Sequence, residues 1–272
     1  MNYPESSPSP GAPPLPERWR VGDGRFARAY ARTGDSGRAV IKTCIAGAYE
    51  TADPQAPART LTAGTFPSGN TRLIEKRPRP WFALVLGQAV QAPAQVVAAV
   101  LPAMARRIPL VAVLRPGVSA PWPDAVLAAL ELCGVENVFS PPLKELPGCL
   151  EALSALGPGG VACLGDFALW SRVRDAGEIS HWLRPSASMV VLDSGAQWDM
   201  EAVAVAHAGV PLTRLNSWDE AAPGSLDAAL AYPGQAPDWC PLVLEPGREA
   251  MWDWPGLPEA LFHQTRVQLG RG

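Results

Sequence analysis

The chain has 272 residues, a hydrophobic content of 47% and a formal net charge of −3. This length and composition exclude fibrous and fully disordered proteins, and they leave enough apolar material for a sizeable core. The most hydrophobic window, residues 96–105, is too short to cross a membrane, and residues 1–17 lack the apolar core of a signal peptide. The sequence therefore predicts a soluble, cytoplasmic protein.

The cysteines and histidines give no sign of a metal centre. Five cysteines stand singly along the chain, without a CxxC or Cys/His spacing, so we expect no metal. An odd number of cysteines favours reduced thiols, which agrees with a cytoplasmic setting. We interpret the three histidines as structural residues.

Charge is unevenly distributed along the chain. Residues 1–17 are rich in Pro and Ser and are predicted to form a disordered tail. Residues 18–80 are predicted to form a basic arm of one or two helices followed by irregular chain. Residues 17–79 carry 12 Lys or Arg against 6 Asp or Glu, whereas residues 80–272 carry 11 against 19. The simpler interpretation is that this arm lies against its own acidic body or in solvent; the alternative is contact with phosphate groups or an acidic partner.

Strand-like and helix-like segments alternate from residue 81 to about residue 210. Apolar runs at 81–87, 108–114, 136–140, 160–165 and 188–193 have the length of strands, and helix-like stretches such as 94–107 and 121–134 separate most of them. Buried strands separated by helices are typical of a parallel sheet that is covered on both faces. The sequence thus predicts an α/β protein with a doubly wound, mostly parallel sheet and helices on both faces, as one Rossmann-like domain over residues 81–272.

The remaining chain carries less regular signals. Residues 225–231 are predicted to form a helix and residues 241–245 a strand. The tryptophans at 239, 252 and 254 are interpreted as part of a satellite core, with a partner surface as the alternative.

Four stretches, taken in order, resemble the nucleotide-binding half of the aldehyde dehydrogenase superfamily, which includes acyl-CoA reductases and, more distantly, histidinol dehydrogenase. They are residues 94–116 (AQVVAAVLPAMARRIPLVAVLRP), 134–138 (GVENV), 161–176 (VACLGDFALWSRVRDA) and 188–210 (SMVVLDSGAQWDMEAVAVAHAGV). The resemblance implies binding of NAD(P) or coenzyme A at the carboxyl ends of the strands. It places Arg115 and Gly165 there as cofactor-binding residues, and the physical reasons agree: a cation suits a phosphate or ribose, and a glycine lets backbone amides approach an anion.

The sequence also departs from that family where its chemistry resides. The helix that begins after Leu192 continues into Pro211 without the family's catalytic cysteine, and Leu183 to Ser186 replace the family's general-base glutamate. Cys240 is the one later thiol and hence the candidate nucleophile. A thiol nucleophile needs both activation and an oxyanion donor.

Three functional hypotheses follow from these observations. The first is a reduced, non-catalytic relative that binds a nucleotide, a coenzyme A derivative or a partner protein, including another copy of itself. The second is a divergent NAD(P)-dependent oxidoreductase or acyl-CoA reductase that uses Cys240. The third is an interaction module whose basic residues 18–79 contact nucleic acid or an acidic partner.

Overall fold

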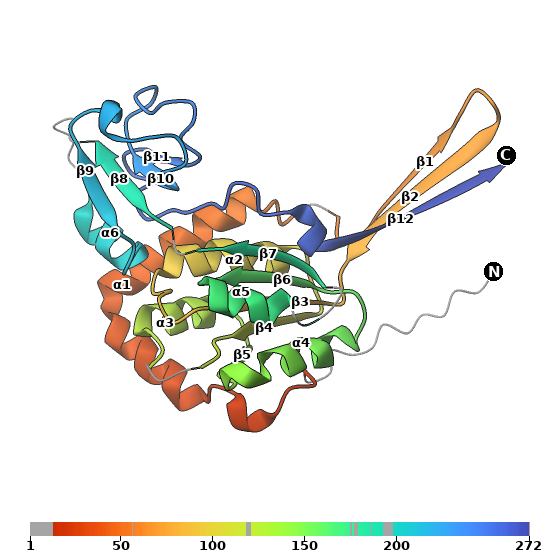
Figure 1. The fold of residues 1–272 in the computed structure, drawn as a ribbon, viewed down its shortest axis with the longest axis horizontal. Coiled ribbons are helices and arrows are strands. Elements are labelled where there is room, and N and C mark those ends of the chain that lie inside the picture. Colours follow the sequence, from red (N-terminus) through yellow and green to blue (C-terminus); the bar gives the residue numbers. More distant parts are fainter. Residues whose placement is uncertain are drawn as a thin grey trace.

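The computed structural model describes residues 13–271, except residues 56, 118–120, 175, 177–178, 186 and 193–197. Its centre is a five-stranded sheet in which every strand runs parallel to its neighbours (Figure 1). The strands lie in the order β5-β4-β3-β6-β7, with bounds β3 (Trp81–Leu86), β4 (Leu110–Leu114), β5 (Asn137–Phe139), β6 (Gly160–Leu164) and β7 (Ser180–Arg184).

Helices cover both faces of this sheet. One face packs against α1 (Asp23–Thr51), α2 (Pro93–Ala105) and α3 (Asp124–Leu132), and the other against α4 (Leu146–Ser154) and α5 (Phe167–Arg174). The chain leaves β3 toward β4 and β5, then returns to the other side of β3 for β6 and β7. The predicted doubly wound α/β fold is confirmed.

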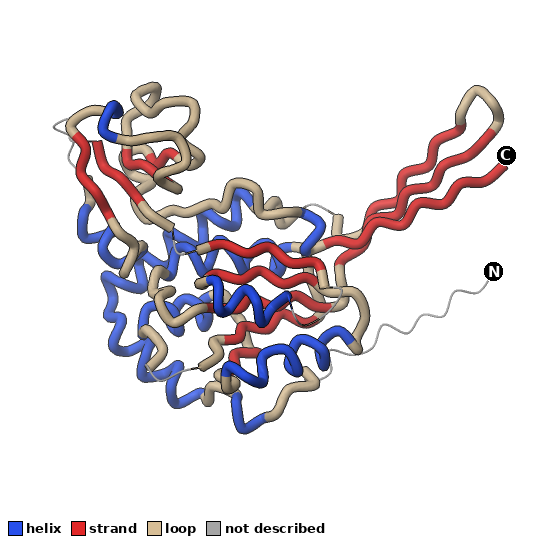
Figure 2. Tube along the Cα trace, in the orientation of Figure 1, coloured by secondary structure: helices blue, strands red, loops and turns tan. Residues whose placement is uncertain are grey.

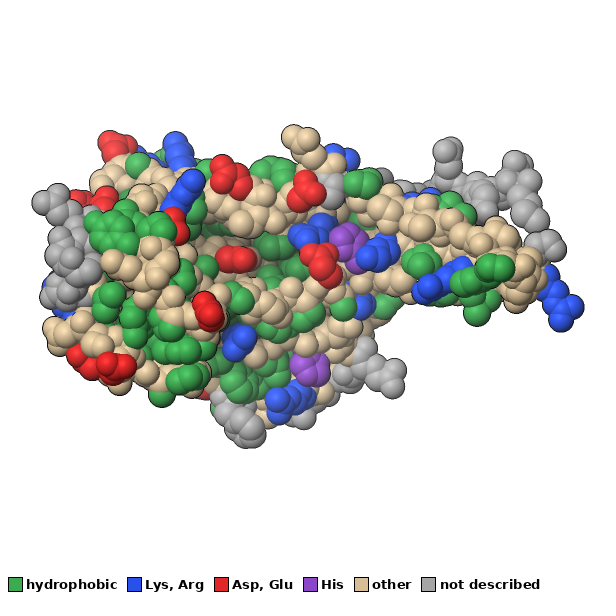
Figure 3. All heavy atoms as spheres, turned by 90° about the horizontal axis from the view of Figure 1, so that it is seen from above, with side chains coloured by type: hydrophobic (Ala, Val, Ile, Leu, Met, Phe, Trp, Pro, Cys, Tyr) green, Lys and Arg blue, Asp and Glu red, His purple; other side chains and the backbone are tan. Residues whose placement is uncertain are grey.

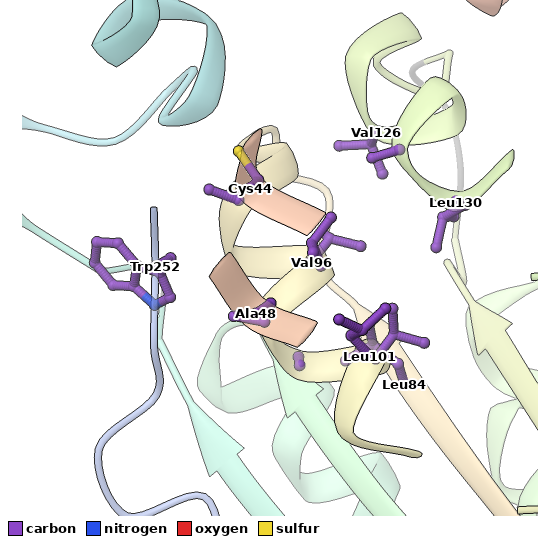
Figure 4. Close-up of a cluster of buried hydrophobic side chains, with 14 of the residues drawn as sticks. Cys44, Ala48, Leu84, Val96, Leu101, Val126, Leu130 and Trp252 are labelled. Atoms are coloured by element: carbon purple, nitrogen blue, oxygen red, sulfur yellow. The ribbon is translucent and has the colours of Figure 1, made fainter. Parts of the chain in front are cut away.

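Strand alternation divides the core into two layers. Phe82 and Leu84 of β3 face the side of α1, α2 and α3, whereas Ala83 and Val85 face α4 and α5. Figure 4 shows part of the first layer, with labelled side chains from α1 (Cys44, Ala48), α2 (Val96, Leu101), α3 (Val126, Leu130) and β3 (Leu84). Successive strand side chains point to opposite faces, so a strand buried on both faces must be apolar at every position, as the run WFALVL is.

The long helix α1 is the part of residues 18–80 that belongs to the core. Its buried residues include Phe26, Ile41 and Cys44. The helix kinks at Gly34, where φ is 68° and ψ is 173°, a conformation that is nearly restricted to glycine. The kink lets one helix follow the curved surface formed by α2, α3 and α6 (Met200–Ala206).

A second parallel sheet of four strands lies beside the first. Its order is β11-β10-β8-β9, with bounds β8 (Met189–Leu192), β9 (Leu212–Leu215), β10 (Ala228–Leu230) and β11 (Val243–Leu244). The predicted strand at 188–193 exists as β8, yet it joins this sheet and not the large one. The helix predicted over 225–231 is wrong: Ala228 to Leu230 form a strand, because pairing with β8 and β11 overrides the helical preference of an alanine-rich run.

Three further strands form an antiparallel sheet that projects from the body (Figures 1 and 2). We call it the projecting sheet; it consists of β1 (Thr60–Thr65), β2 (Asn70–Pro78) and β12 (His263–Arg271). The sequence predicted irregular chain over residues 53–80. A hairpin forms there because the Phe66–Asn70 turn is closed by a glycine with positive φ, Gly69, whose amide donates to the Phe66 carbonyl.

Short 3-10 helices and one end of the predicted tail complete the structure. The 3-10 helices are η1 (Glu17–Trp19), η2 (Leu143–Glu145), η3 (Trp218–Glu220) and η4 (Glu259–Leu261). Residues 13–17, predicted to be disordered, are ordered because Leu15 is buried against the α4 side of the large sheet. Residues 1–12 of that tail lie outside the described residues. Within the described chain, no helix has the length and apolar character needed to span a bilayer.

Candidate functional site

The carboxyl edge of the large sheet is the place where this topology usually binds a ligand. The strand order reverses between β3 and β6, and such a switch point opens a crevice outside the strand ends. Gly87 follows β3 and Gly165 follows β6. The Gly87 amide donates to the Leu164 carbonyl at 2.7 Å, so the two strand ends are joined at the switch point itself.

Arg115 follows β4, as predicted, and its side chain is buried, with 2% of its surface exposed. Its guanidinium donates to the carbonyls of Pro121 (2.9 Å) and Gln88 (3.0 Å) and lies 5.4 Å from the centre of the Trp122 ring. Burial lowers the pKa of Arg115. Arg115 therefore ties together the loops that follow β3 and β4.

Gly165 lies at the same edge, and its surroundings explain why the position holds glycine. Its amide donates to the Arg184 carbonyl at 2.9 Å, and a Cβ atom added there would lie 2.6 Å from a methyl group of Leu169. The next residue, Asp166, accepts a hydrogen bond from the Leu169 amide at 3.0 Å and caps α5. The structure thus brings Gly165 and Arg115 to one edge, each already hydrogen-bonded within the protein.

Cys240 lies elsewhere, in an apolar cluster of the four-stranded sheet with Leu226, Trp218 and Trp239. Its Sγ atom donates to the Leu242 carbonyl at 3.4 Å. Burial raises the pKa of the Cys240 thiol, and this hydrogen bond offsets part of the increase. Burial also raises the pKa of the other four thiols. A thiol with a raised pKa holds less of the thiolate that nucleophilic catalysis requires.

His207 is the most strongly perturbed imidazole. Its Nε2 lies 2.8 Å from the Glu249 carbonyl, and burial lowers the pKa of His207 to about 4 despite this hydrogen bond. The ring packs 5.5 Å from that of Trp252. No cysteine contacts it among the described residues, so His207 is placed as a structural side chain and not as a base for Cys240.

A cavity that the sequence did not predict lies where the carboxyl end of β7 meets the four-stranded sheet. It has a volume of about 270 Å³, and its lining includes Arg184, Asp227, Trp239, Trp252 and Trp254. Arg184 is the last residue of β7, a strand that the sequence did not predict, so no local signal singled it out. The tryptophans come from a distant and irregular stretch, which gave no periodic signal.

The described residues also include side chains of the types that bind metal ions. No group of three or more His, Cys, Asp or Glu side chains within residues 13–271, gaps excepted, is arranged to hold a metal ion.

Several solved structures are similar to this chain. Histidinol dehydrogenase from Elizabethkingia anophelis matches with a TM-score of 0.62 and 11% identity, covering 93% of this chain and 77% of that chain. An indole-3-acetaldehyde dehydrogenase in its apo form matches with a TM-score of 0.46 and 12% identity over 91% of this chain and 79% of that one. An NAD+ complex of an aldehyde dehydrogenase from Bacillus cereus matches with a TM-score of 0.40 and 11% identity, covering 66% and 40%.

No family model matches the sequence, and neither does any curated protein. At 11% identity a structural match establishes the fold and leaves the activity open. The resemblance is thus confirmed for the fold: the chain shares its architecture with histidinol dehydrogenase.

Proposed function

We propose that this protein acts by binding and not by thiol chemistry, and that its ligand is a nucleotide-type small molecule at the carboxyl edge of the large sheet. The observation that carries the proposal is the switch point between β3 and β6, with Gly87 and Gly165 at the reversal. NAD(P) and coenzyme A are the ligands implied by the resemblance of the sequence.

Arg115 is the residue proposed to meet the anionic part of such a ligand. Its present acceptors are the neutral carbonyls of Gln88 and Pro121. A phosphate is a stronger acceptor than a carbonyl because the hydrogen bond becomes charge-assisted. The Nε of Arg115 has no hydrogen-bond partner among the described residues, so the guanidinium has a donor to offer a phosphate beside its two carbonyl bonds.

The surroundings of Cys240 support the part of the proposal that excludes thiol chemistry. Its thiol is half-buried, its pKa is raised, and its hydrogen bond goes to a carbonyl. An activated cysteine needs the opposite surroundings, namely a cation, a helix N-terminus or a neighbouring base.

A thermal-shift screen against NAD, NADP, coenzyme A and ATP tests the proposal. A ligand at about 100 times its dissociation constant stabilises the folded state by about 2.7 kcal/mol. We expect a shift with one of these ligands that Arg115→Ala abolishes relative to its own baseline. Arg106→Ala is the matched control, because Arg106 also donates to a backbone carbonyl, that of Pro102, but lies at the C-terminal end of α2, where it bonds Glu259 as well. A chain that none of the four ligands stabilises would refute the nucleotide proposal.

The projecting sheet favours a second function, namely contact with an acidic protein surface, of which a second copy of this chain is the simplest. Figure 3 shows basic and apolar side chains gathered along this sheet. Its strands carry five Lys or Arg against one Asp or Glu, while the rest of the chain carries 18 against 25. Opposite net charges on the two parts favour pairing between copies.

The apolar residues on and next to the projecting sheet also favour contact with another chain. Leu61, Phe66, Val267 and Leu269 are all exposed, and Leu269 exposes 73% of its surface. Among the described residues, its outer strands β1 and β12 also have one edge each without a strand partner, and an open, partly apolar edge is a ready surface for another chain. Sedimentation velocity of the purified protein, which resolves monomer from dimer, tests this second function.

A further inference from the structure

The cavity beside β7 has walls that are fixed by contacts outside it. Trp254 donates its indole N–H to the Gln95 carbonyl of α2 at 2.9 Å, and its ring meets the ring of Trp182 edge-on, with centres 5.4 Å apart. Trp252 packs edge-on against Trp254 at 5.3 Å. The neighbouring Ala250 carbonyl accepts a hydrogen bond from Cys44 of α1 at 2.8 Å. The aromatic wall is therefore formed before any ligand arrives.

Two opposite charges line this cavity without pairing with each other. Arg184 lies 5.8 Å from the ring centre of Trp182, and within the described chain its guanidinium has neither a hydrogen bond nor an ion pair. The Oδ2 atom of Asp227 accepts hydrogen bonds from the Ser188 amide at 2.9 Å and from the Ser188 hydroxyl at 3.3 Å. The other oxygen of Asp227 accepts no hydrogen bond from a described residue. Each charge is thus left with capacity for a ligand.

The indoles supply the third element of recognition. Trp239, Trp252 and Trp254 line the cavity, and the electron-rich face of an indole attracts cations as well as apolar groups. Trp252 is 4% exposed, and its indole N–H has no acceptor among the described residues. A buried donor without an acceptor costs free energy that a ligand oxygen would recover.

We propose that this cavity binds a small zwitterion, with its carboxylate on Arg184 and its cationic group between Asp227 and the indole faces. A singly charged ligand would leave one of the two cavity charges without a partner. The volume of about 270 Å³ lies below the roughly 300–1,000 Å³ of drug-sized pockets, so a compact ligand fits and a dinucleotide does not. The lining of the cavity includes none of Gly87, Gly165 and Arg115, the residues of the nucleotide site proposed above.

Three probes share a head group with three methyls. They test separately whether the ligand needs its positive charge and its negative charge. Glycine betaine carries both charges, choline carries the positive charge alone, and 3,3-dimethylbutyrate carries the negative charge alone. Binding is followed by the indole ¹⁵N–¹H resonances, with signals assigned by Trp239→Phe and Trp252→Phe. We expect betaine to shift these signals saturably and to bind at least about tenfold more tightly than the other two probes.

The variants assign the charges to residues. Arg184→Gln and Asp227→Asn should each weaken betaine binding about tenfold or more, whereas Arg214→Gln, an exposed arginine of β9 outside the cavity, should leave it unchanged. The inference fails if betaine gives no saturable shift, if the three probes bind equally well, or if Arg184→Gln and Arg214→Gln behave alike. Should Asp227→Asn not fold, the comparison of 3,3-dimethylbutyrate with betaine on the unaltered chain still decides the role of the cation. None of these outcomes depends on nucleotide binding at Arg115.

Discussion

At the scale of single residues, Cys240 separates a binding protein from a thiol enzyme. Because burial raises the pKa of its thiol, the thiolate fraction at pH 8 lies below that of a free thiol, and alkylation should be correspondingly slow. We expect iodoacetamide to modify Cys240 more slowly than it modifies glutathione, as measured by mass spectrometry over time. Selective and rapid labelling of Cys240 would instead revive the oxidoreductase hypothesis.

His207 gives a residue-scale prediction about pH. Burial holds its folded-state pKa at about 4, below the value of 6.5 for a free imidazole. The unfolded chain therefore binds a proton first as the pH falls, so stability is lost between pH 6.5 and pH 4. At pH 5 the expected loss from this residue is about 2 kcal/mol. Urea unfolding at pH 7 and pH 5 should show this loss in the unaltered chain and a smaller loss in His207→Gln, while His181→Gln, an exposed control, should follow the unaltered chain.

Arg115 shows what the sequence could and could not predict at this scale. A strand followed by a cation predicted its position at the carboxyl edge. Its burial depends on the Pro121 carbonyl of its own loop and on the Gln88 carbonyl of the loop after β3, and no local pattern contains the second contact. We expect Arg115→Ala to lower the free energy of unfolding by about 2–4 kcal/mol, because both acceptors lose a charged donor. Denaturant unfolding measures this, and a loss below about 1 kcal/mol would contradict the clamp.

At the scale of elements, the kink of α1 rests on one glycine. Gly34 has a φ of 68° and a ψ of 173°, with open space where a Cβ atom would lie. Gly34→Ala should therefore destabilise the protein through backbone strain alone, by about 1–3 kcal/mol. Gly24→Ala, in the first turn of the same helix and also with open space, should be neutral or stabilising. Thermal unfolding of the pair decides, and equal melting temperatures would contradict a required kink.

The elements also show why the large sheet was predictable and the other sheets were less so. Four strands of the large sheet, β3, β4, β5 and β6, are apolar runs with a helix nearby in sequence, so local patterns sufficed for them. The fifth, β7, was missed because its sequence SHWLR is only partly buried and forms no apolar run. The strand β10 has only three residues, and its alanine-rich run favours a helix until β8 and β11 pair with it. The hairpin of β1 and β2 lacks a continuous apolar face. Its sheet is largely exposed, so its strands mix polar and apolar residues.

At the scale of the whole molecule, the projecting sheet determines whether the protein stays a monomer or self-associates. In the register of β12 with β2, Val267 and Leu269 share a face with Ile74 and Arg72. If copies associate through this face, Val267→Thr with Leu269→Thr should convert dimers to monomers in sedimentation velocity. Leu61→Thr, on the opposite face, is the matched control. A monomer for the unaltered chain at concentrations of tens of micromolar would exclude self-association through this sheet.

The pairing of β2 with β12 has a consequence for biosynthesis. Pro78 lies opposite His263, so β2 leaves the ribosome long before its second neighbour exists. Contacts between residues so distant in sequence form slowly. Until β12 is made, the edge of β2 that it will occupy stays open, and other nascent chains or a chaperone can reach it. The yield of folded protein should therefore depend on the speed of translation through the last third of the message, because the edge of β2 stays open until β12 has been made.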